Sequence, residues 1–315
     1  MKYRVLIVGA GAVGVACAMS MMYSQIASHL ILTDIKMDKA QGEALDLAHA
    51  APLMGAPQVE ALPMDALVPV DLCVITAGAK QHPGETRLEL LARNAHAMRE
   101  IAEAIERGGL PRVVVVVSNP VDVMTELLRA RWEPLGVAVL GTGTVLDTTR
   151  LRSFISEKFA IHPSSVHAWV LGEHGDSSVS MLDSARVAGV PLREFCARNG
   201  VPFDDAWRDA LTREVRGAAQ EIIARKGATS HAIGAVTARI ARAIARDERT
   251  VLTVSTYSKE LSCTLGLPAI VGSHGATSLG LPECSARERS ELAHSAEVVR
   301  EAIAQARAHL DQRNS

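Results

Sequence analysis

The sequence predicts an α/β fold, in which a Rossmann-type doubly wound parallel sheet is followed by an α+β domain. Three observations predict it. Short apolar runs alternate with longer amphipathic stretches from Tyr3 to about Gly143. A glycine-rich segment, Gly9–Gly14, follows the first apolar run. Five consecutive valines, Val113–Val117, show no alternation, which is typical of a central strand covered on both faces.

Short apolar runs predict strands at Arg4–Val8, His29–Thr33, Leu72–Thr76, Val113–Ser118 and Val137–Leu140. Helical patterns lie between them at Ala12–Ser24, Lys39–Ala50, Arg87–Arg107 and Val121–Arg131. The third of these helices has apolar residues at intervals of three and four and is followed by two glycines, as a helix with one buried face often is. The alternation predicts βαβ units that feed one parallel sheet.

The second half has a different pattern. Strands are expected at Val166–Leu171, Thr250–Tyr257 and Pro268–Gly272, and long helices at Asp204–Lys226, Ser230–Ala245 and Ala286–Leu310. A chain of 315 residues has room for about two domains. We therefore expect a first domain of residues 1–143 and an α+β domain of residues 144–315.

Composition and charge exclude several classes of protein. The 33 Lys and Arg residues are balanced by 35 Asp and Glu residues, which gives a net charge of −2. A nucleic-acid binder or a protein held on anionic membranes normally carries a strong basic surface. The five cysteines are odd in number and have no C-x-x-C spacing, which predicts reduced thiols and a cytoplasmic location.

The stretch from Val5 to Thr33 has no Asp, Glu, Lys or Arg. By composition it also fits a signal peptide or a membrane span, and Cys17 fits a lipoprotein site. Glycines interrupt the apolar run, however, and polar residues follow it. Because those glycines are better explained by a nucleotide-binding loop, we expect no membrane association.

The glycines of Gly9–Gly14 have the spacing G-x-G-x-x-G between an expected strand and an expected helix. Asp34 lies about 20 residues beyond Gly14, at the end of the next strand. Such glycines let the backbone approach a diphosphate at a helix N-terminus, and such an acid binds ribose hydroxyls. The carboxylate favours NAD, although Lys36 leaves NADP open; the alternative is a plain glycine turn beside a surface acid.

In an open parallel sheet, ligands bind beyond the carboxyl ends of the strands. The segments expected there are Thr76–Gln81, Ser118–Pro120 and Gly141–Gly143, and the second half adds Gly172–Asp176. His174, in the last of these, is a candidate acid and base because an imidazole titrates near neutral pH.

Asp147 is the candidate for orienting this imidazole, and Arg150 is the candidate for binding a substrate carboxylate. Their spacing also fits an ordinary surface pair on a helix. The sequence contains no metal-ligand spacing, so we expect no metal. The residues alone thus predict an NAD-dependent oxidoreductase that acts on a small acid.

Five ordered motifs carry a resemblance to a known family: Gly9–Gly14, Ala77–Arg87, Ser118–Asp122, Leu146–Arg150 and Gly172–Ser177. With them the chain resembles the L-lactate and malate dehydrogenase family from Val5 to about Leu281, and its bacterial lactate-type members most of all. The resemblance implies catalytic roles for His174 and Asp147 and a carbonyl-polarising role for Arg87. It also implies that Arg150, Gln81, Asn119 and Thr229 bind the substrate. The positions implied to bind NAD are Gly9, Gly11, Val13, Gly14, Asp34, Thr76, Ala77, Gly78, Asn119 and Ile233.

Gln81 stands where malate-type relatives have an arginine that pairs with a second carboxylate. A neutral glutamine cannot balance that charge in a dry site, so the resemblance implies pyruvate and L-lactate. A common Tyr-Tyr-Gly is here Ser230–Ala232, which leaves longer 2-oxo acids open. Malate or other 2-hydroxy acid dehydrogenases, and a catalytically silent NAD-binding protein, are the alternatives.

Arg152 and His167 match positions at which bacterial relatives bind fructose 1,6-bisphosphate between subunits. The resemblance therefore implies a homotetramer that is activated by this effector. An ordinary cluster of cations at an interface is the alternative.

Overall fold

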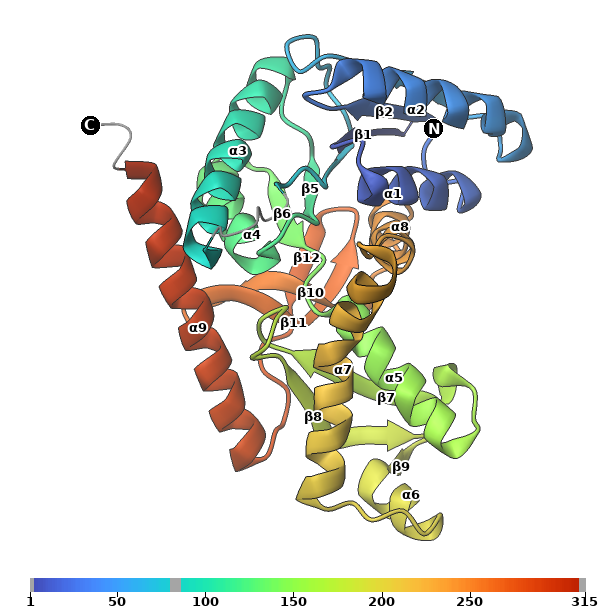
Figure 1. Cartoon of the computed structure of the whole chain (residues 1–315), viewed down its shortest axis with the longest axis vertical. Coiled ribbons are helices and arrows are strands. Elements are labelled where there is room, and N and C mark those ends of the chain that lie inside the picture. The colour runs from blue at the N-terminus through green and yellow to red at the C-terminus, as the bar shows by residue number, and fades with distance from the viewer. Residues whose placement is uncertain (1–2, 80–85, 312–315) are drawn as a thin grey trace.

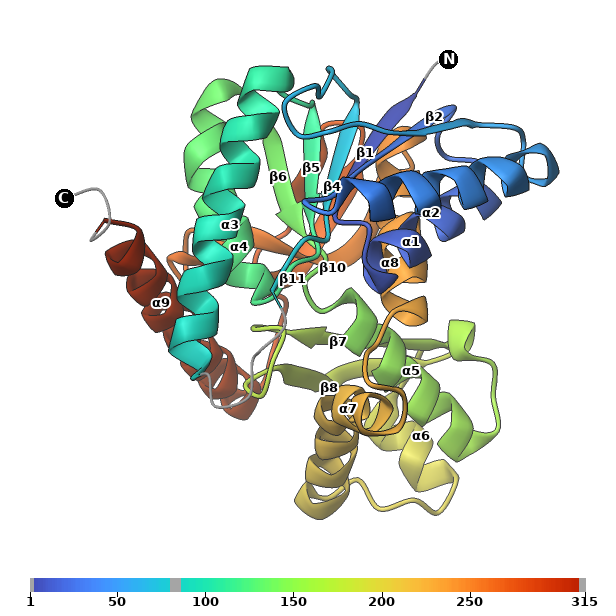
Figure 2. The ribbon, with the colours of Figure 1, turned by 45° about the horizontal axis from the view of Figure 1, so that its top comes forward.

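The chain is described here from a computed structural model, which covers residues 3–79 and 86–311, the side chain of Arg87 excepted. Within these residues a nine-stranded sheet has the order β12-β11-β10-β6-β5-β4-β1-β2-β3 (Figures 1 and 2). Its parallel strands are β1 (Arg4–Val8), β2 (His29–Thr33), β3 (Gln58–Ala61), β4 (Leu72–Ile75), β5 (Val113–Val116) and β6 (Ala138–Gly141). This order, 3-2-1-4-5-6, is that of the Rossmann fold, and the predicted fold class is confirmed.

Helices cover both faces of the large sheet, as Figure 2 shows. One face carries α1 (Ala12–Tyr23), α2 (Met37–Ala50) and α8 (His231–Ala245); the other carries α3 (Arg87–Gly108), α4 (Val121–Trp132) and α9 (Ala286–Asp311). Val113 and Val115 pack into the first layer, whereas Val114 and Val116 pack into the second. Because each face of β5 is buried, its sequence shows no alternation of polar and apolar residues.

Three antiparallel strands extend this sheet beyond β6. They are β10 (Thr250–Ser258), β11 (Cys263–Gly272) and β12 (Gly275–Ser278). The sequence predicts the first two within the second domain, yet they continue the sheet of the first half. The sheet thus crosses the expected boundary at residues 143 and 144, and the boundary itself stays a prediction. β11 also begins at Cys263, five residues before the expected start.

The remaining elements surround a smaller sheet in the lower part of Figure 1. Its strands are β7 (Val166–Leu171), β8 (Val179–Val187) and β9 (Val190–Pro191), and its helices are α5 (Val145–Phe159), α6 (Leu192–Arg198) and α7 (Asp205–Lys226). Short 3₁₀ turns lie at Ala51–Leu53, Glu133–Leu135 and Pro163–Ser165. The sequence patterns did not predict α5, α6, β3, β8, β9 or β12.

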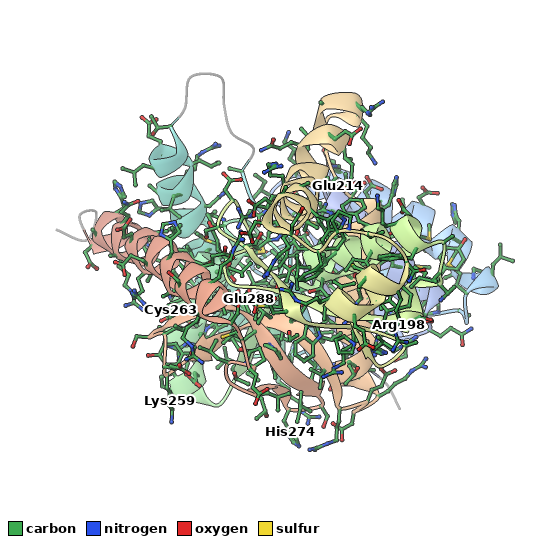
Figure 3. All side chains as sticks on the ribbon, turned by 90° about the horizontal axis from the view of Figure 1, so that it is seen from below. Arg198, Glu214, Lys259, Cys263, His274 and Glu288 are labelled. Atoms are coloured by element: carbon green, nitrogen blue, oxygen red, sulfur yellow. The ribbon has the colours of Figure 1, made fainter. Side chains whose placement is uncertain are left out.

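The smaller sheet is joined to the larger sheet and to α9. The main chains of Gly172, just after β7, and Gly266, in β11, exchange hydrogen bonds of 2.9 and 2.8 Å. Glu288, labelled in Figure 3, is only 1% exposed, and its carboxylate accepts a hydrogen bond of 3.0 Å from the main chain of Asp183 in β8. The end of β7 is therefore fixed against the large sheet. No helix within the described ranges has the length and apolarity needed to cross a membrane.

Candidate active site

The glycine-rich loop connects β1 to α1 and rests on the end of β4. The hydroxyl of Thr76 donates hydrogen bonds to the carbonyl oxygens of Val8 (3.1 Å) and Gly9 (3.0 Å). Gly9 has a φ of +104°, and a Cβ there would lie 2.8 Å from the main-chain nitrogen of Ala77. A Cβ on Gly14 would lie 1.8 Å from the carbonyl oxygen of Gly9. These two positions require glycine because backbone meets backbone.

Gly11, in contrast, faces open space. It is the N-cap of α1, and a Cβ at this position would meet no atom of the described structure within 4 Å. Val13, in the first turn of α1, is half-buried. The loop thus presents an uncovered stretch of backbone at a helix N-terminus, which is an arrangement suited to a phosphate group.

Asp34 directly follows β2, beside this loop. Its carboxylate accepts hydrogen bonds from the main-chain nitrogens of Ala10 (2.7 Å) and Lys36 (2.9 Å). A carboxylate has about four acceptor positions, so two bonds fix its orientation and leave capacity for hydroxyl donors. The structure therefore brings the predicted acid next to the predicted glycine loop.

His174 and Asp147 form a close pair. His174 follows β7 and Asp147 lies in the first turn of α5; Nδ1 of His174 lies 2.6 Å from Oδ2 of Asp147. The other carboxylate oxygen of Asp147 accepts a 3.0 Å bond from the guanidinium of Arg150. The side chains of Arg150 and Asp147 are 12% and 8% exposed, so this is a largely buried pair and not the surface pair considered above.

The charges around His174 set its protonation. Burial alone would lower the pKa of His174, but the Asp147 carboxylate outweighs it and the net pKa lies above the usual 6.5. Burial alone would likewise raise the pKa of Asp147, but His174 and Arg150 hold it below its ordinary range. A carboxylate on Nδ1 keeps the proton there, which leaves Nε2 as the nitrogen for proton exchange with a ligand.

A second carboxylate, on Asp122, contacts His174 from α4. The main-chain nitrogen of His174 donates a 2.8 Å hydrogen bond to Oδ2 of Asp122, which is 3% exposed. Burial raises the pKa of Asp122 to about 6. Asp122 ends the Ser118–Asp122 motif, but the sequence pattern alone predicts no role for it. Its place after a predicted strand was the available signal.

Asn119 lies directly beyond β5. The main-chain carbonyl oxygen of Asn119 accepts a 3.0 Å bond from the side-chain amide of Asn94 on α3. The side-chain oxygen of Asn94 in turn accepts a 2.8 Å bond from the main-chain nitrogen of Ala79. The segments after β4 and β5 are therefore tied together at the carboxyl edge of the sheet. Gly78, in the segment after β4, faces the segment after β5, where a Cβ on it would be 3.8 Å from the side chain of Ser118.

A cavity of about 960 Å³ opens beside Asn119. It extends between the loop after β7 and helices α7 and α9, and its lining includes Gly175, Ile223 and His294. Thr229 is half-buried in the connection from α7 to α8, and Ile233 packs in the first turns of α8 against the core. Gln81 and the side chain of Arg87 lie outside the described residues, so their predicted roles stay predictions.

Arg152 and His167 lie on neighbouring elements. Nε of Arg152, on α5, donates a 3.0 Å bond to the carbonyl of Ala168, the residue after His167 on β7. Burial lowers the pKa of Arg152, whereas His167 is exposed. Arg152 also lines a separate cavity of about 470 Å³ together with Trp169 and Arg239.

The five cysteines are all unpaired, and four are buried. Burial raises the pKa of Cys17 to about 11 and that of Cys263 to about 12. Cys263 lies next to α9 in Figure 3, with its sulfur 3.8 Å from the carbonyl of Ala296. Thiols of this kind are unreactive at neutral pH. Among the residues that the structure describes, no group of three or more His, Cys, Asp or Glu is placed to hold a metal ion.

Comparisons with known proteins agree with this geometry. The family model of the lactate/malate dehydrogenase NAD-binding domain matches residues 3–131, and that of the lactate/malate dehydrogenase α/β C-terminal domain matches residues 144–310. The L-lactate dehydrogenase of Allorhizobium ampelinum is 40% identical over 302 residues, covering 95% of this chain and 97% of that protein. The L-lactate dehydrogenase of Moorella thermoacetica is 38% identical over 310 residues, covering 96% and 97%.

Solved structures give the same result. A lactate dehydrogenase from a deep-sea metagenome library of the Medee basin superposes with a TM-score of 0.90 at 34% identity, over 97% of this chain and 99% of that one. The minor L-lactate dehydrogenase of Enterococcus mundtii superposes with a TM-score of 0.89 at 36% identity, over 96% and 98%. The chain therefore belongs to the lactate/malate dehydrogenase family and is an NAD-dependent 2-hydroxy acid dehydrogenase.

Proposed function

We propose that the enzyme is an L-lactate dehydrogenase that interconverts pyruvate and L-lactate. The observation that carries the proposal is the buried chain of contacts from Arg150 through Asp147 to His174. It places a cation for a carboxylate beside an imidazole that can exchange a proton. The relatives named L-lactate dehydrogenase and the neutral Gln81 support pyruvate as the substrate.

His174 acts as the acid in pyruvate reduction. Its Nε2 proton passes to the carbonyl oxygen, while Nδ1 keeps its proton and its bond to Asp147. In lactate oxidation, neutral His174 takes the hydroxyl proton back at Nε2. Asp147 stays ionised in both directions, because it orients the ring and stabilises the imidazolium.

Arg150 holds the substrate carboxylate. One of its five N–H donors is engaged by Asp147, and the remaining donors include an edge that fits a carboxylate with two parallel bonds. Arg87, at the start of α3, is proposed to polarise the reacting carbonyl. Asn119 and Thr229 are proposed to complete the substrate pocket.

The glycine loop fits NAD, and the fit rests on the open space over Gly11. The amide nitrogens at the start of α1 would bind the diphosphate, and Asp34 would accept bonds from the adenosine ribose. Thr76, Ala77, Gly78 and Ile233 would line the rest of the dinucleotide site. When bound, NADH supplies the hydride to the carbonyl carbon.

Replacing Gly11 by alanine is expected to weaken NADH binding about tenfold or more with at most a small loss of stability from the changed N-cap, because the added methyl group enters only the open space for the diphosphate. Fluorescence titration with NADH and urea unfolding would measure the two effects. Gly217→Ala is the matched control, since a Cβ on this α7 glycine also meets no described atom within 4 Å. Equal NADH affinity in both variants would contradict the proposed diphosphate position.

Gln81→Arg is expected to shift the ratio of kcat/KM for oxaloacetate over pyruvate about tenfold or more toward oxaloacetate, because an unpaired second carboxylate is strongly disfavoured in a dry site. NADH oxidation followed at 340 nm with each acid gives the ratio. The wild-type assay also tests the proposed function: preference for oxaloacetate, or for longer 2-oxo acids, indicates another 2-hydroxy acid dehydrogenase. A catalytically silent NAD-binding protein, the other alternative, would bind NADH but would reduce neither acid.

We also infer a cytoplasmic homotetramer that is activated by fructose 1,6-bisphosphate. The position of Arg152 beside the strand that carries His167 supports this, because two such cations and their two-fold mates would form an anion site. We expect the bisphosphate to lower the KM for pyruvate at pH 6 to 8, and Arg152→Gln to remove the effect. Kinetic curves that do not respond to the bisphosphate over this range would rule out the activation.

A further inference from the structure

The hydrogen-bonded chain around His174 continues beyond the pair with Asp147. Asp122 binds the main chain of His174 through Oδ2, and its other oxygen, Oδ1, accepts a 2.6 Å bond from the hydroxyl of Ser255. Ser255 is fully buried in β10 and lies 133 positions from Asp122 in the sequence. Strand β10 is thus connected through the carboxylate of Asp122 to the loop that carries His174.

The surroundings hold the Ser255 hydroxyl in place. Ser255 pairs with Gly141 of β6, the strand that leads into α5. A Cβ on Gly141 would lie 2.8 Å from the Ser255 hydroxyl and 2.4 Å from that of Thr125. Because Gly141 and Thr125 crowd this position, truncating the side chain of Ser255 frees only the space of the hydroxyl itself.

The same contact governs the charge of Asp122. Burial raises the pKa of Asp122, and the charge of Glu173 raises it further. The hydrogen bonds from Ser255 and from the His174 main chain oppose these effects. Without the hydroxyl, the carboxylate would take up a proton at a higher pH, close to the working range of the enzyme.

The charge of Asp122 reaches the imidazole. Within residues 3–79 and 86–311, the charged groups that act most on His174 are Asp147 and Arg150 from α5 and Asp122 from α4. Both carboxylates favour the imidazolium, and Arg150 disfavours it. With Asp122 uncharged, His174 would lose one of the two carboxylates among the described residues that raise its pKa, and Asp147 would remain.

We propose that Ser255 is a positioning residue of the dehydrogenase reaction, whose hydroxyl keeps Asp122 ionised and thereby fixes the main chain and the proton affinity of His174. The inference rests on the proposed acid-base role of His174. A purely structural role of Ser255 makes a different prediction: removing the hydroxyl would then lower stability, or lower activity by the same factor at every pH.

The test compares Ser255→Ala with Thr256→Val. Thr256 is the next residue of β10, and its buried hydroxyl has no hydrogen-bond partner within the described part of the chain, so its removal is a matched control. Wild-type Asp122 is ionised above a pKa of about 6, so for pyruvate reduction we expect Ser255→Ala to lower kcat/KM about three- to tenfold near pH 7, where Asp122 is protonated in the variant alone, but less than twofold at pH 6. Thr256→Val should follow the wild type at both pH values.

A second variant isolates the role of the carboxylate. Asp122→Asn keeps the size of the side chain but removes the charge, so it should show the same selective loss near pH 7. Adding Ser255→Ala to Asp122→Asn should cause no further change in the pH profile. If Ser255→Ala lowers activity by one factor at all pH values, or acts equally in the Asp122→Asn background, the proposal is wrong.

NMR titration of histidine-labelled protein separates this inference from the proposed function. The His174 signal, assigned by its loss in His174→Asn, should titrate at lower pH in Ser255→Ala than in the wild type and in Thr256→Val. This readout needs no substrate, so it holds even if the enzyme prefers another 2-oxo acid. An unchanged His174 titration in Ser255→Ala would overturn the inference while leaving the dehydrogenase activity in place.

Discussion

His174→Asn is expected to lower kcat/KM for pyruvate reduction by about 10³- to 10⁴-fold, which is the upper range for loss of a positioned general acid. Asparagine retains hydrogen-bonding groups and a similar reach, but it cannot deliver a proton to the developing alkoxide. NADH binding should be unchanged, because within the described residues no hydrogen bond links His174 to the glycine loop or to Asp34. Steady-state kinetics and a fluorescence titration with NADH would measure both.

His274→Asn is the control for this variant. His274 is exposed in the turn between β11 and β12, labelled in Figure 3, and lies outside the proposed site. It should have wild-type kinetics. If His174→Asn kept more than about a tenth of wild-type kcat/KM, His174 would not be the acid and the mechanism would have to be abandoned.

The pH dependence has a defined sign. Pyruvate reduction requires protonated His174, whose pKa is raised above 6.5, so the rate should persist through neutral pH and fall as pH rises through the raised pKa. Lactate oxidation requires the neutral form and should rise over the same interval. In Asp147→Asn the carboxylate that raises this pKa is absent, so the fall in reduction rate should move to lower pH.

The parts of the fold that the sequence predicts well are those that local pattern determines. β1, β2 and β7 have the predicted bounds, because each is an apolar run that ends at a charged residue, a glycine or a turn. α5 was not predicted, although it carries Asp147, Arg150 and Arg152. Its buried face is partly polar: the hydroxyl of Thr148 accepts a 2.9 Å bond from the main chain of Val170 and lies 3.0 Å from the hydroxyl of Thr253. Tertiary partners satisfy these groups, so the helix lacks an apolar periodicity.

The residues of the candidate site also divide into those that local sequence predicts and those that it does not. His174 and Asp147 were predicted as a pair from their chemistry, and the structure places their atoms 2.6 Å apart. Asp122 and Ser255 were not found, because their roles depend on a contact between α4 and β10 that no local spacing encodes. The antiparallel strands β10 and β11 determine this contact, and the sequence pattern predicts both strands in the second domain.

Arg150→Lys is expected to lower kcat/KM for pyruvate by about 10- to 100-fold, mainly through KM. Lysine keeps the positive charge but replaces a planar fork with a single ammonium group, so the substrate carboxylate loses one of two parallel bonds, each worth about 1.5–3 kcal/mol. The bond of 3.0 Å from Arg150 to Asp147 is also lost, which removes a group that lowers the pKa of Asp147.

The choice of lysine decides between two roles for Arg150. If Arg150 served only as a positive charge near Asp147 and the substrate, Arg150→Lys would retain most of the activity and Arg150→Gln would lose it. If the planar fork is needed, both variants lose activity, and KM for pyruvate rises while the affinity for NADH stays at the wild-type value. Arg198→Lys is the control, since Arg198 is an exposed residue of α6 that pairs with Glu194 on the same helix. Because a guanidinium fork grips a carboxylate through geometry as well as charge, we expect the second result, and a lysine variant within tenfold of the wild type would contradict it.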